Sequence, residues 1–174
     1  IFSPLVFALI VAFLPQERWI RPVSLGLSLI HFALSLRLFG LFDPGKATLQ
    51  LVHQVPWVPS FGISYFVGID GISFWLVILS TFLTPLVVLA SWTAIQERVR
   101  SFHICLFLLL TSMVGTFLAM DAILFYVFFE ASLIPMYFMV GIWGGSRRLY
   151  ATMKFFIYTM AGSLFMLVAI IALM

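Results

Sequence analysis

Long apolar runs alternate with short polar connections along this chain. Five runs are close to 20 residues long, and they cover 23–42, 72–92, 102–120, 122–143 and 149–174. The apolar core of a bilayer is about 30 Å thick and needs about 20 helical residues to cross it, so each run predicts a membrane-spanning helix. A sixth run, 1–14, reaches only about 21 Å at the helical rise of about 1.5 Å per residue. The pattern predicts an all-α, polytopic integral membrane bundle.

The two ends of the sequence suggest a piece of a longer chain. It begins without an initiator methionine and stops within an apolar run. A signal peptide would need a basic stretch before the first apolar run and a small-residue cleavage site after it, and Pro15-Gln16-Glu17-Arg18 follows instead. We therefore expect residues 1–174 to be the N-terminal part of one membrane domain.

Composition agrees with a location in the membrane. Only 9% of the 174 residues are charged and 64% are hydrophobic, whereas soluble domains carry about 25% charged residues. This excludes a soluble enzyme and a nucleic-acid-binding protein, despite the sequence pI near 9.4, and makes lipid a partner. The single cysteine, Cys105, excludes a disulfide framework or a cysteine-based metal cluster within the chain.

The few charges predict the orientation. Alternate connections hold six arginines, namely Arg18, Arg21, Arg98, Arg100, Arg147 and Arg148. The remaining connections hold Asp43, Lys46, Asp70 and Asp121. Positive residues concentrate in cytoplasmic loops, so the N-terminus is expected outside and the arginine loops in the cytoplasm. In the long outer connection, the β-branched and aromatic run 63–69 predicts a short β element.

Two polar stripes follow helical spacing within the predicted spans. One consists of Ser24, Ser28, His31 and Ser35, and the other of Ser73, Ser80, Thr84 and Ser91. Small hydroxylated residues let membrane helices pack closely, and packing is the favoured interpretation of the second stripe. The first contains an imidazole near mid-span. His31 is either a satisfied packing residue or a relay in a hydrated proton path.

The sharpest candidate is Glu130. It lies eight residues into the run 122–143, about 12 Å along the helix, where a charge costs a few kcal/mol unless it is paired or hydrated. Tyr126 and Tyr137 share its helical stripe, and Pro135 frees the carbonyl of Ala131 from its helical partner. A freed carbonyl beside a carboxylate favours a water site. Glu130 is thus a candidate proton site, with a protonated structural glutamate as the alternative.

Three other polar residues near helix ends have weaker signals. Lys154 lies six residues from Arg148, so it either snorkels to the interface or relays protons. For Arg37, snorkelling is the favoured interpretation. His103, beside the cluster of arginines, is expected at the interface.

Three segments carry a resemblance to a known family: FYVFFEASLIPM (Phe125–Met136), WGGSRRLYATMKFFIYTMA (Trp143–Ala161) and VGIDGISFWLVILSTFLTPLVVLASW (Val67–Trp92). They resemble the antiporter-like membrane subunits called subunit M in bacterial NADH–quinone oxidoreductase, respiratory complex I. The resemblance implies the first six helices of an antiporter-like fold. It also implies that Glu130 is the family's essential glutamate, and it aligns Lys154 with the lysine of the K-F-F motif.

The family resemblance also implies a function and a setting. Such subunits translocate protons, driven by electron transfer from NADH to quinone, and lie in the bacterial inner membrane beside other membrane-arm subunits, some of them antiporter-like. The complex uses NADH, flavin, iron–sulfur clusters and quinone, with no cofactor in this chain. Three alternatives remain. They are a subunit of a multi-subunit sodium/proton antiporter, the corresponding subunit of a photosynthetic ferredoxin-fed quinone reductase, and a membrane scaffold.

Overall fold

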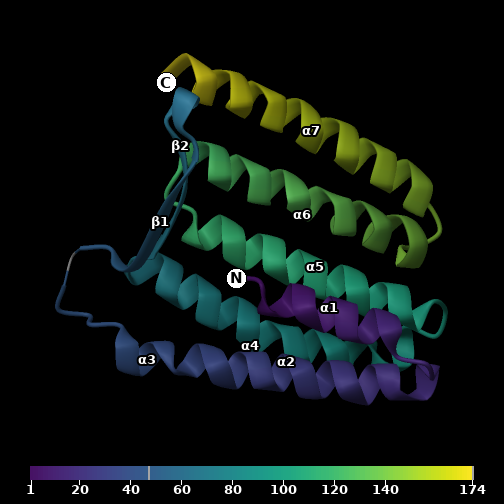
Figure 1. The fold of residues 1–174 in the computed structure, drawn as a ribbon. Helices are drawn as coiled ribbons and strands as arrows, with labels where there is room; N and C mark the ends of the chain where they lie inside the picture. The colour runs from purple at the N-terminus through teal and green to yellow at the C-terminus, as the bar shows by residue number, and fades with distance from the viewer. Residues whose placement is uncertain (47, 174) are drawn as a thin grey trace.

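The structure is a computed structural model that describes residues 1–46 and 48–173. Its α-helices are α1 (Ser3–Phe13), α2 (Ile20–Leu36), α3 (Leu38–Leu41), α4 (Gly71–Ala94), α5 (Val99–Leu118), α6 (Ala122–Trp143) and α7 (Arg148–Leu173). Strands β1 (Gln50–Val58) and β2 (Ile63–Ile69) lie between α3 and α4. The long helices lie side by side, and the two strands cross one end of them (Figure 1).

The helical prediction is confirmed with small differences at the ends of helices. α6 has the predicted bounds, while α2 begins at Ile20 rather than at residue 23. Pro22 does not prevent this earlier start, because the fixed φ of proline suits the first helical turn. The predicted span 23–42 is interrupted at Arg37, which separates α2 from α3. Within the described residues, five helical stretches are long and apolar enough to cross a membrane, and α1 is shorter.

A β-hairpin occupies the long outer connection. The predicted element 63–69 is confirmed as β2, and it pairs antiparallel with β1 through a corner that contains Gly62 at φ 70°. The other edge of β2 meets the segment after α5, where the Met120 N–H donates to the Phe66 carbonyl at 2.8 Å. β1 was not predicted, because its Pro56 and its mixture of polar and apolar residues weaken the strand signal.

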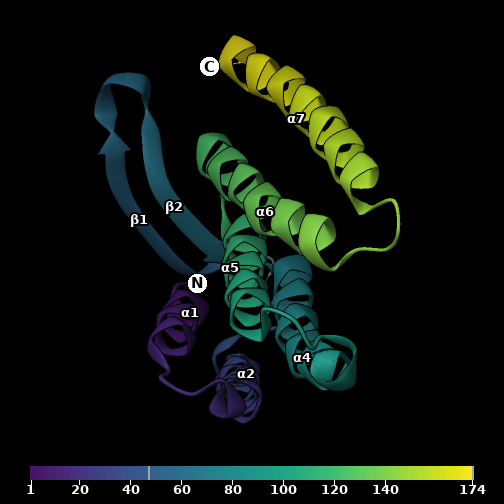
Figure 2. The ribbon, with the colours of Figure 1, turned by 90° about the vertical axis from the view of Figure 1, so that its right-hand side faces the viewer.

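The helices form a cluster with a one-sided extension. α1, α2, α4 and α5 lie close together, and α6 and then α7 continue from α5 as a row (Figure 2). An apolar core joins α1, α2 and α5 through Phe7, Val11, Ile20, Val99 and Phe107. α5 is therefore the central helix, because the cluster packs on one side of it and the helix with Glu130 on the other.

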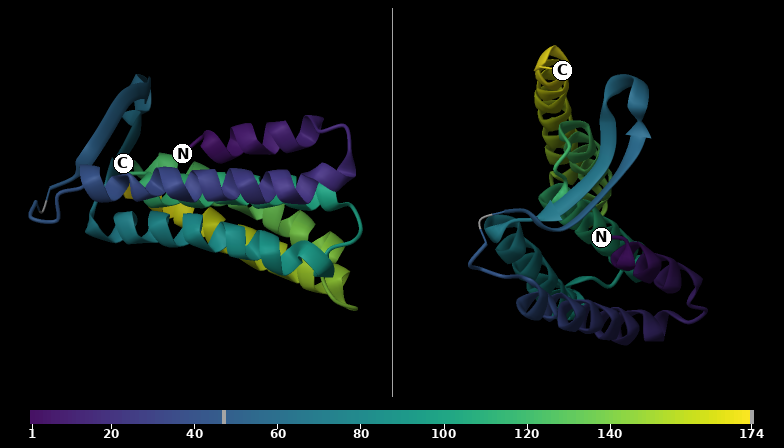
Figure 3. Two further views of the ribbon diagram at one scale, coloured as in Figure 1. Left: turned by 90° about the horizontal axis from the view of Figure 1, so that it is seen from below. Right: turned by 60° about the vertical axis from the view of Figure 1, so that its left-hand side comes forward.

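The three connections that contain the arginines come together at one end of the bundle, as their alternation predicts. Arg21 Nη2 donates to the Ile95 carbonyl at 2.8 Å, and Arg100 Nη2 donates to the Leu14 carbonyl at 2.8 Å. The hairpin and the last turns of α7 lie at the opposite end (Figures 1 and 3). We call these the arginine end and the hairpin end.

Both polar stripes face the interior. All members of the stripes on α2 and α4 are buried, and the hydroxyls of Ser35 and Thr81 lie 2.8 Å apart across the two helices. Most of the other hydroxyls donate to carbonyls three or four residues earlier in their own helix. This arrangement supports the packing interpretation for the stripe on α4.

Candidate functional site in the membrane interior

Asp121 fixes the beginning of the helix that holds the candidate glutamate. Its Oδ1 accepts from the N–H groups of Ile123 at 2.9 Å and Leu124 at 3.1 Å, which gives α6 an N-cap. Its Oδ2 accepts from the Ser64 N–H of β2 at 3.0 Å. One carboxylate therefore joins the hairpin to α6 and sets where α6 begins.

Close packing against α5 then fixes the position of α6 sideways. A β-carbon added to Gly115 on α5 would overlap the ring of Phe128 on α6. The ring therefore occupies the space that any larger residue at position 115 would need. Phe128 precedes Glu130 by two residues, so the same contact also helps to set the rotation of α6.

Glu130 is half-buried on α6 and lies toward α7. Its Oε1 is buried and has no hydrogen-bond partner within the described residues. The Tyr126 hydroxyl lies close both to the Glu130 carboxylate and to the Ser163 hydroxyl of α7. The sequence pointed to Tyr126 through its helical spacing, whereas Ser163 is a new member of the site. The Tyr126 hydroxyl thus links the Glu130 carboxylate to Ser163, and a buried carboxylate oxygen beside such a hydroxyl can hold a proton or bind water.

The second half of α6 keeps the same face toward α7. The ring of Tyr137 packs edge-on against Phe156 of α7, with centroids 5.3 Å apart. Pro135 is buried within the helix and has no N–H for the carbonyl of Ala131, one residue from Glu130. The predicted stripe of Tyr126, Glu130 and Tyr137 is therefore one face at the α6–α7 interface.

Lys154 is exposed on α7 and lies apart from Glu130. Its Nζ is 5.6 Å and 5.9 Å from the ring centroids of Tyr150 and Tyr158. Glu130 lies 13 residues from the end of α6 at Trp143, and Lys154 lies six residues from the start of α7. By helical rise, these positions differ in depth by about 10 Å. Within the described residues, the one salt bridge joins Lys46 and Asp43, so the structure does not bring Lys154 to Glu130.

His31 lies on the opposite side of α5 from Glu130. It is 8% exposed, its ring packs edge-on against Phe7 with centroids 5.9 Å apart, and its Nδ1 has no partner within the described residues. A satisfied packing histidine would have a partner at this atom. His103 lies in the first turns of α5 at the arginine end, where it is 1% exposed, with Nδ1 2.8 Å from the Val99 carbonyl.

Comparisons with known proteins identify the family. Residues 1–116 match the model of a family described as NADH-ubiquinone oxidoreductase chain 4, amino terminus. The chain belongs to this family. Residues 119–174, which contain α6 and α7, match a model described as NADH:quinone oxidoreductase/Mrp antiporter, TM. The resemblance to subunit M is thus confirmed.

Curated relatives and solved structures agree with this membership of the chain 4 family. The chain is 41% identical to NADH-quinone oxidoreductase subunit M of Rhodobacter capsulatus, over 99% of this chain and 34% of the relative. It is 42% identical to NADH-ubiquinone oxidoreductase chain 4 of Arabidopsis thaliana, over 100% and 36%. A chain of respiratory complex I from Thermus thermophilus superposes with a TM-score of 0.81 at 32% identity, over 97% of this chain and 33% of that one.

This chain therefore spans about a third of the length of the chain 4 relatives that it matches. The mostly helical membrane fold, with a small hairpin, is the one expected for the first helices of an antiporter-like subunit. Among the residues that the structure describes, no group of three or more His, Cys, Asp or Glu side chains could hold a metal ion. In α6 and α7, the group that is best suited to proton transfer is the carboxylate of Glu130, because its buried Oε1 has no hydrogen-bond partner within the described residues.

Proposed function

We propose that this chain is part of a proton-translocating subunit of an NADH–quinone oxidoreductase, in which Glu130 takes up and releases a proton inside the membrane. The observation that carries the proposal is the buried, unpartnered Oε1 of Glu130 at the α6–α7 interface. A carboxylate at such depth is costly in a purely structural role, whereas a proton site needs a group that exists in both protonation states.

The environment of Glu130 supports switching between two states. A cation that approaches a buried carboxylate stabilises its ionised form, and withdrawal of the cation favours the protonated form. The neighbouring hydroxyl of Tyr126, which also lies close to Ser163, can donate or accept a hydrogen bond, so it fits either form. The carbonyl freed by Pro135 offers an acceptor for water on the same helix.

We further propose relay roles for His31 and Lys154. The Nδ1 of the buried His31 has no partner within the described residues. This supports a hydrated path at His31 more than it supports dry packing. Lys154 lies six residues after Arg148, the first residue of α7. Its ammonium lies near the rings of Tyr150 and Tyr158, alongside the helix rather than beyond its end. Neither residue contacts Glu130, so each would act at a separate step of the path.

In this proposal the redox chemistry takes place in other subunits. The chain contributes proton transfer, and NADH, flavin, iron–sulfur clusters and quinone are bound elsewhere in the complex. Other membrane-arm subunits would then be its partners, and the exposed apolar side chains of β1, such as Leu51, Val55 and Trp57, offer a contact surface. We place the chain in the bacterial inner membrane, with the arginine end in the cytoplasm.

A subunit of a sodium/proton antiporter is the second candidate. It is supported by the match of residues 119–174 to a model that also covers Mrp antiporters. The match of residues 1–116 to a chain 4 model favours the oxidoreductase.

Replacement of Glu130 by Gln in the full-length subunit of the assembled complex tests the proposal. We expect the complex to assemble, to lose NADH-driven proton pumping and to oxidise NADH more slowly when coupled. Glu17→Gln, at an exposed position of the arginine end, is the matched control. Co-purification with NADH-oxidising subunits supports the oxidoreductase, whereas sodium-dependent proton exchange without them supports the antiporter.

A further inference from the structure

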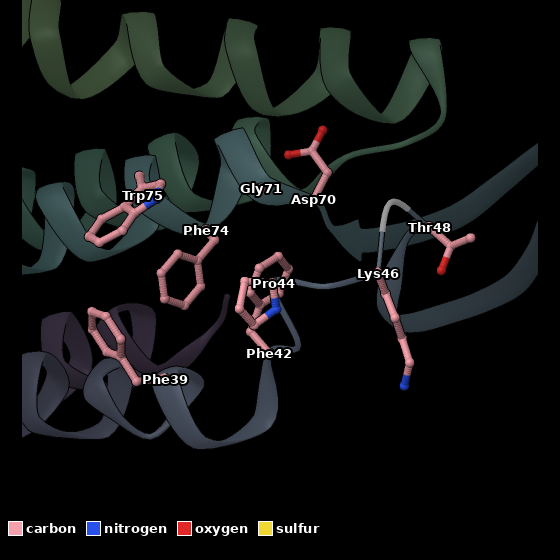
Figure 4. Close-up of a pocket in the computed structure, with 9 residues that line it drawn as sticks. All are labelled: Phe39, Phe42, Pro44, Lys46, Thr48, Asp70, Gly71, Phe74 and Trp75. Atoms are coloured by element: carbon pink, nitrogen blue, oxygen red, sulfur yellow. The ribbon is translucent and has the colours of Figure 1, made fainter.

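A cavity of about 430 Å³ lies at the hairpin end of the bundle, between α3, the beginning of α4 and the connection after α3 (Figure 4). Its apolar wall is made of four rings, from Phe39, Phe42, Phe74 and Trp75. Their centroids lie between 4.8 and 5.8 Å apart in successive pairs. Phe74 is buried while Phe39 and Trp75 are exposed. The wall is therefore held by the packing of Phe74, and the rings of Phe39 and Trp75 face outward.

The cavity lies at the level where helices leave the apolar layer of a membrane. α3 ends at Leu41 and α4 begins at Gly71, and both ends border the cavity. Aromatic residues gather at this level because their rings tolerate the boundary between lipid tails and headgroups. Farther from the hairpin end, α2 exposes Leu36 and α4 exposes Leu79. An occupant would therefore meet a polar layer on one side and an acyl-chain layer on the other.

The polar side of the cavity carries both signs of charge. Lys46, Thr48 and Asp70 line it. Figure 4 shows Lys46 and Thr48 on the side away from the rings of Phe39 and Trp75, and Asp70 beside Gly71 with its carboxylate turned away from Lys46. Lys46 Nζ lies 3.3 Å from Asp43 Oδ2. Asp70 caps α4 by accepting from the N–H groups of Ile72 and Ser73 at 3.0 and 2.7 Å. These N–H groups lower the pKa of the Asp70 carboxyl, chiefly through that of Ser73, so this carboxyl is ionised at neutral pH.

We propose that this cavity binds the headgroup and glycerol region of phosphatidylethanolamine, with the phosphate at Lys46 and Thr48 and the ammonium at Asp70. An ionised carboxylate accepts about four hydrogen bonds, so the helix cap leaves acceptor capacity for a primary ammonium. The site is independent of the proton site at Glu130, which lies on α6 rather than beside this cavity.

Charge and hydrogen bonding select this headgroup. Two carboxylates, Asp43 and Asp70, stand against one ammonium, Lys46, so a lipid with net negative charge would meet net repulsion. A choline headgroup carries the same charges as ethanolamine, but its quaternary nitrogen has no N–H to donate to Asp70. The zwitterion with a primary ammonium satisfies both ends of the cavity.

The test measures lipid retained by the intact complex that contains the full-length subunit. The complex is exchanged into nanodiscs of equal parts phosphatidylethanolamine, phosphatidylcholine and phosphatidylglycerol, washed in detergent, and analysed by quantitative lipid mass spectrometry. Asp70→Asn removes the charge but keeps a good N-cap. Asp121→Asn makes the same change at the N-cap of α6, which lies at the same end of the bundle and does not line the cavity.

We expect the wild type and Asp121→Asn to retain more phosphatidylethanolamine per complex than Asp70→Asn does, and Lys46→Gln to lose it as well. Equal retention by Asp70→Asn and Asp121→Asn would overturn the proposal, and so would preferential retention of phosphatidylglycerol or phosphatidylcholine by the wild type. A cavity covered by a neighbouring protein would give no difference between the variants, which also overturns it. Glu130→Gln should retain the lipid as the wild type does, which separates this result from the proton-site proposal.

Discussion

The ring of Phe128 on α6 lies directly against Gly115 on α5, in the space that a side chain at position 115 would fill. This contact joins the central helix to the helix that holds the candidate proton site. Glu130 follows Phe128 by two residues, so a shift of that ring would also move the carboxylate. The geometry of the site thus depends on a residue that has no polar group of its own.

Gly115→Ala is expected to destabilise the complex and to reduce proton pumping. The added methyl overlaps the ring of Phe128, and overpacking of this kind costs about 1–3 kcal/mol. Thermal stability and NADH-driven pumping of the purified complex measure the effect. Gly26→Ala is the matched control, because its added methyl meets nothing within 4 Å.

A second substitution shows whether the overlap is the cause. Phe128→Leu in the Gly115→Ala background makes room for the methyl and should recover part of the stability and pumping. Equal behaviour of Gly115→Ala and Gly26→Ala would show that the close contact does not position α6.

Much of this fold could be predicted because membrane helices have a strong signal. A run such as 122–143 has the length that the bilayer sets, and a capping aspartate at position 121 marks its start. β2 was predicted from its β-branched and aromatic residues. β1 was not predicted, because its own composition gives a weak strand signal. It is held in place by pairing with β2, which in turn bonds to the segment at Met120.

The candidate site was predicted in part, for a similar reason. The spacing of Tyr126 and Glu130 is a property of one helix and can be read from the sequence. Ser163 belongs to α7, and its position beside Tyr126 depends on how two helices pack. The burial of His103 likewise depends on how helices pack around α5, which its neighbours in the sequence do not reveal.

His31→Leu tests the relay role of the histidine. The apolar side chain removes the unpartnered buried Nδ1, so the fold should be unchanged or slightly more stable. If His31 relays protons, NADH-driven pumping should fall a few-fold while assembly stays intact. Initial pumping rates in reconstituted vesicles check this, and rates equal to the wild type would leave His31 as a packing residue only.

The Asp70 cap should give a pH-dependent contribution to stability. N–H groups of α4 hold the pKa of its carboxyl below the usual 3.8. A group whose pKa is lower in the folded state stabilises fully above its unfolded pKa, and this stabilisation disappears as the pH falls through the folded pKa. The wild type should therefore be more stable than Asp70→Asn above pH 3.8, and the difference should shrink below it. Melting temperatures of both complexes across pH measure this, and a constant difference would contradict it.

The orientation can be checked with single cysteines in a Cys105→Ser background. Ser146 lies in the connection between α6 and α7 at the arginine end, and Ser60 lies at the corner of the hairpin. An impermeant maleimide should label Ser146→Cys in inside-out vesicles and Ser60→Cys in right-side-out vesicles, because arginine-rich loops stay in the cytoplasm. The reverse labelling pattern would invert the proposed topology.

The most direct test of the proton site compares Glu130→Gln with Glu17→Gln in the same reconstituted complex. Proton uptake is followed by quenching of a pH-sensitive dye after NADH and quinone are added, and it is normalised to assembled complex. We expect pumping to be lost in Glu130→Gln and retained in Glu17→Gln, since only the first removes an ionisable group from the membrane interior. Pumping by Glu130→Gln equal to that of Glu17→Gln would contradict the assignment of Glu130 as the proton-carrying residue.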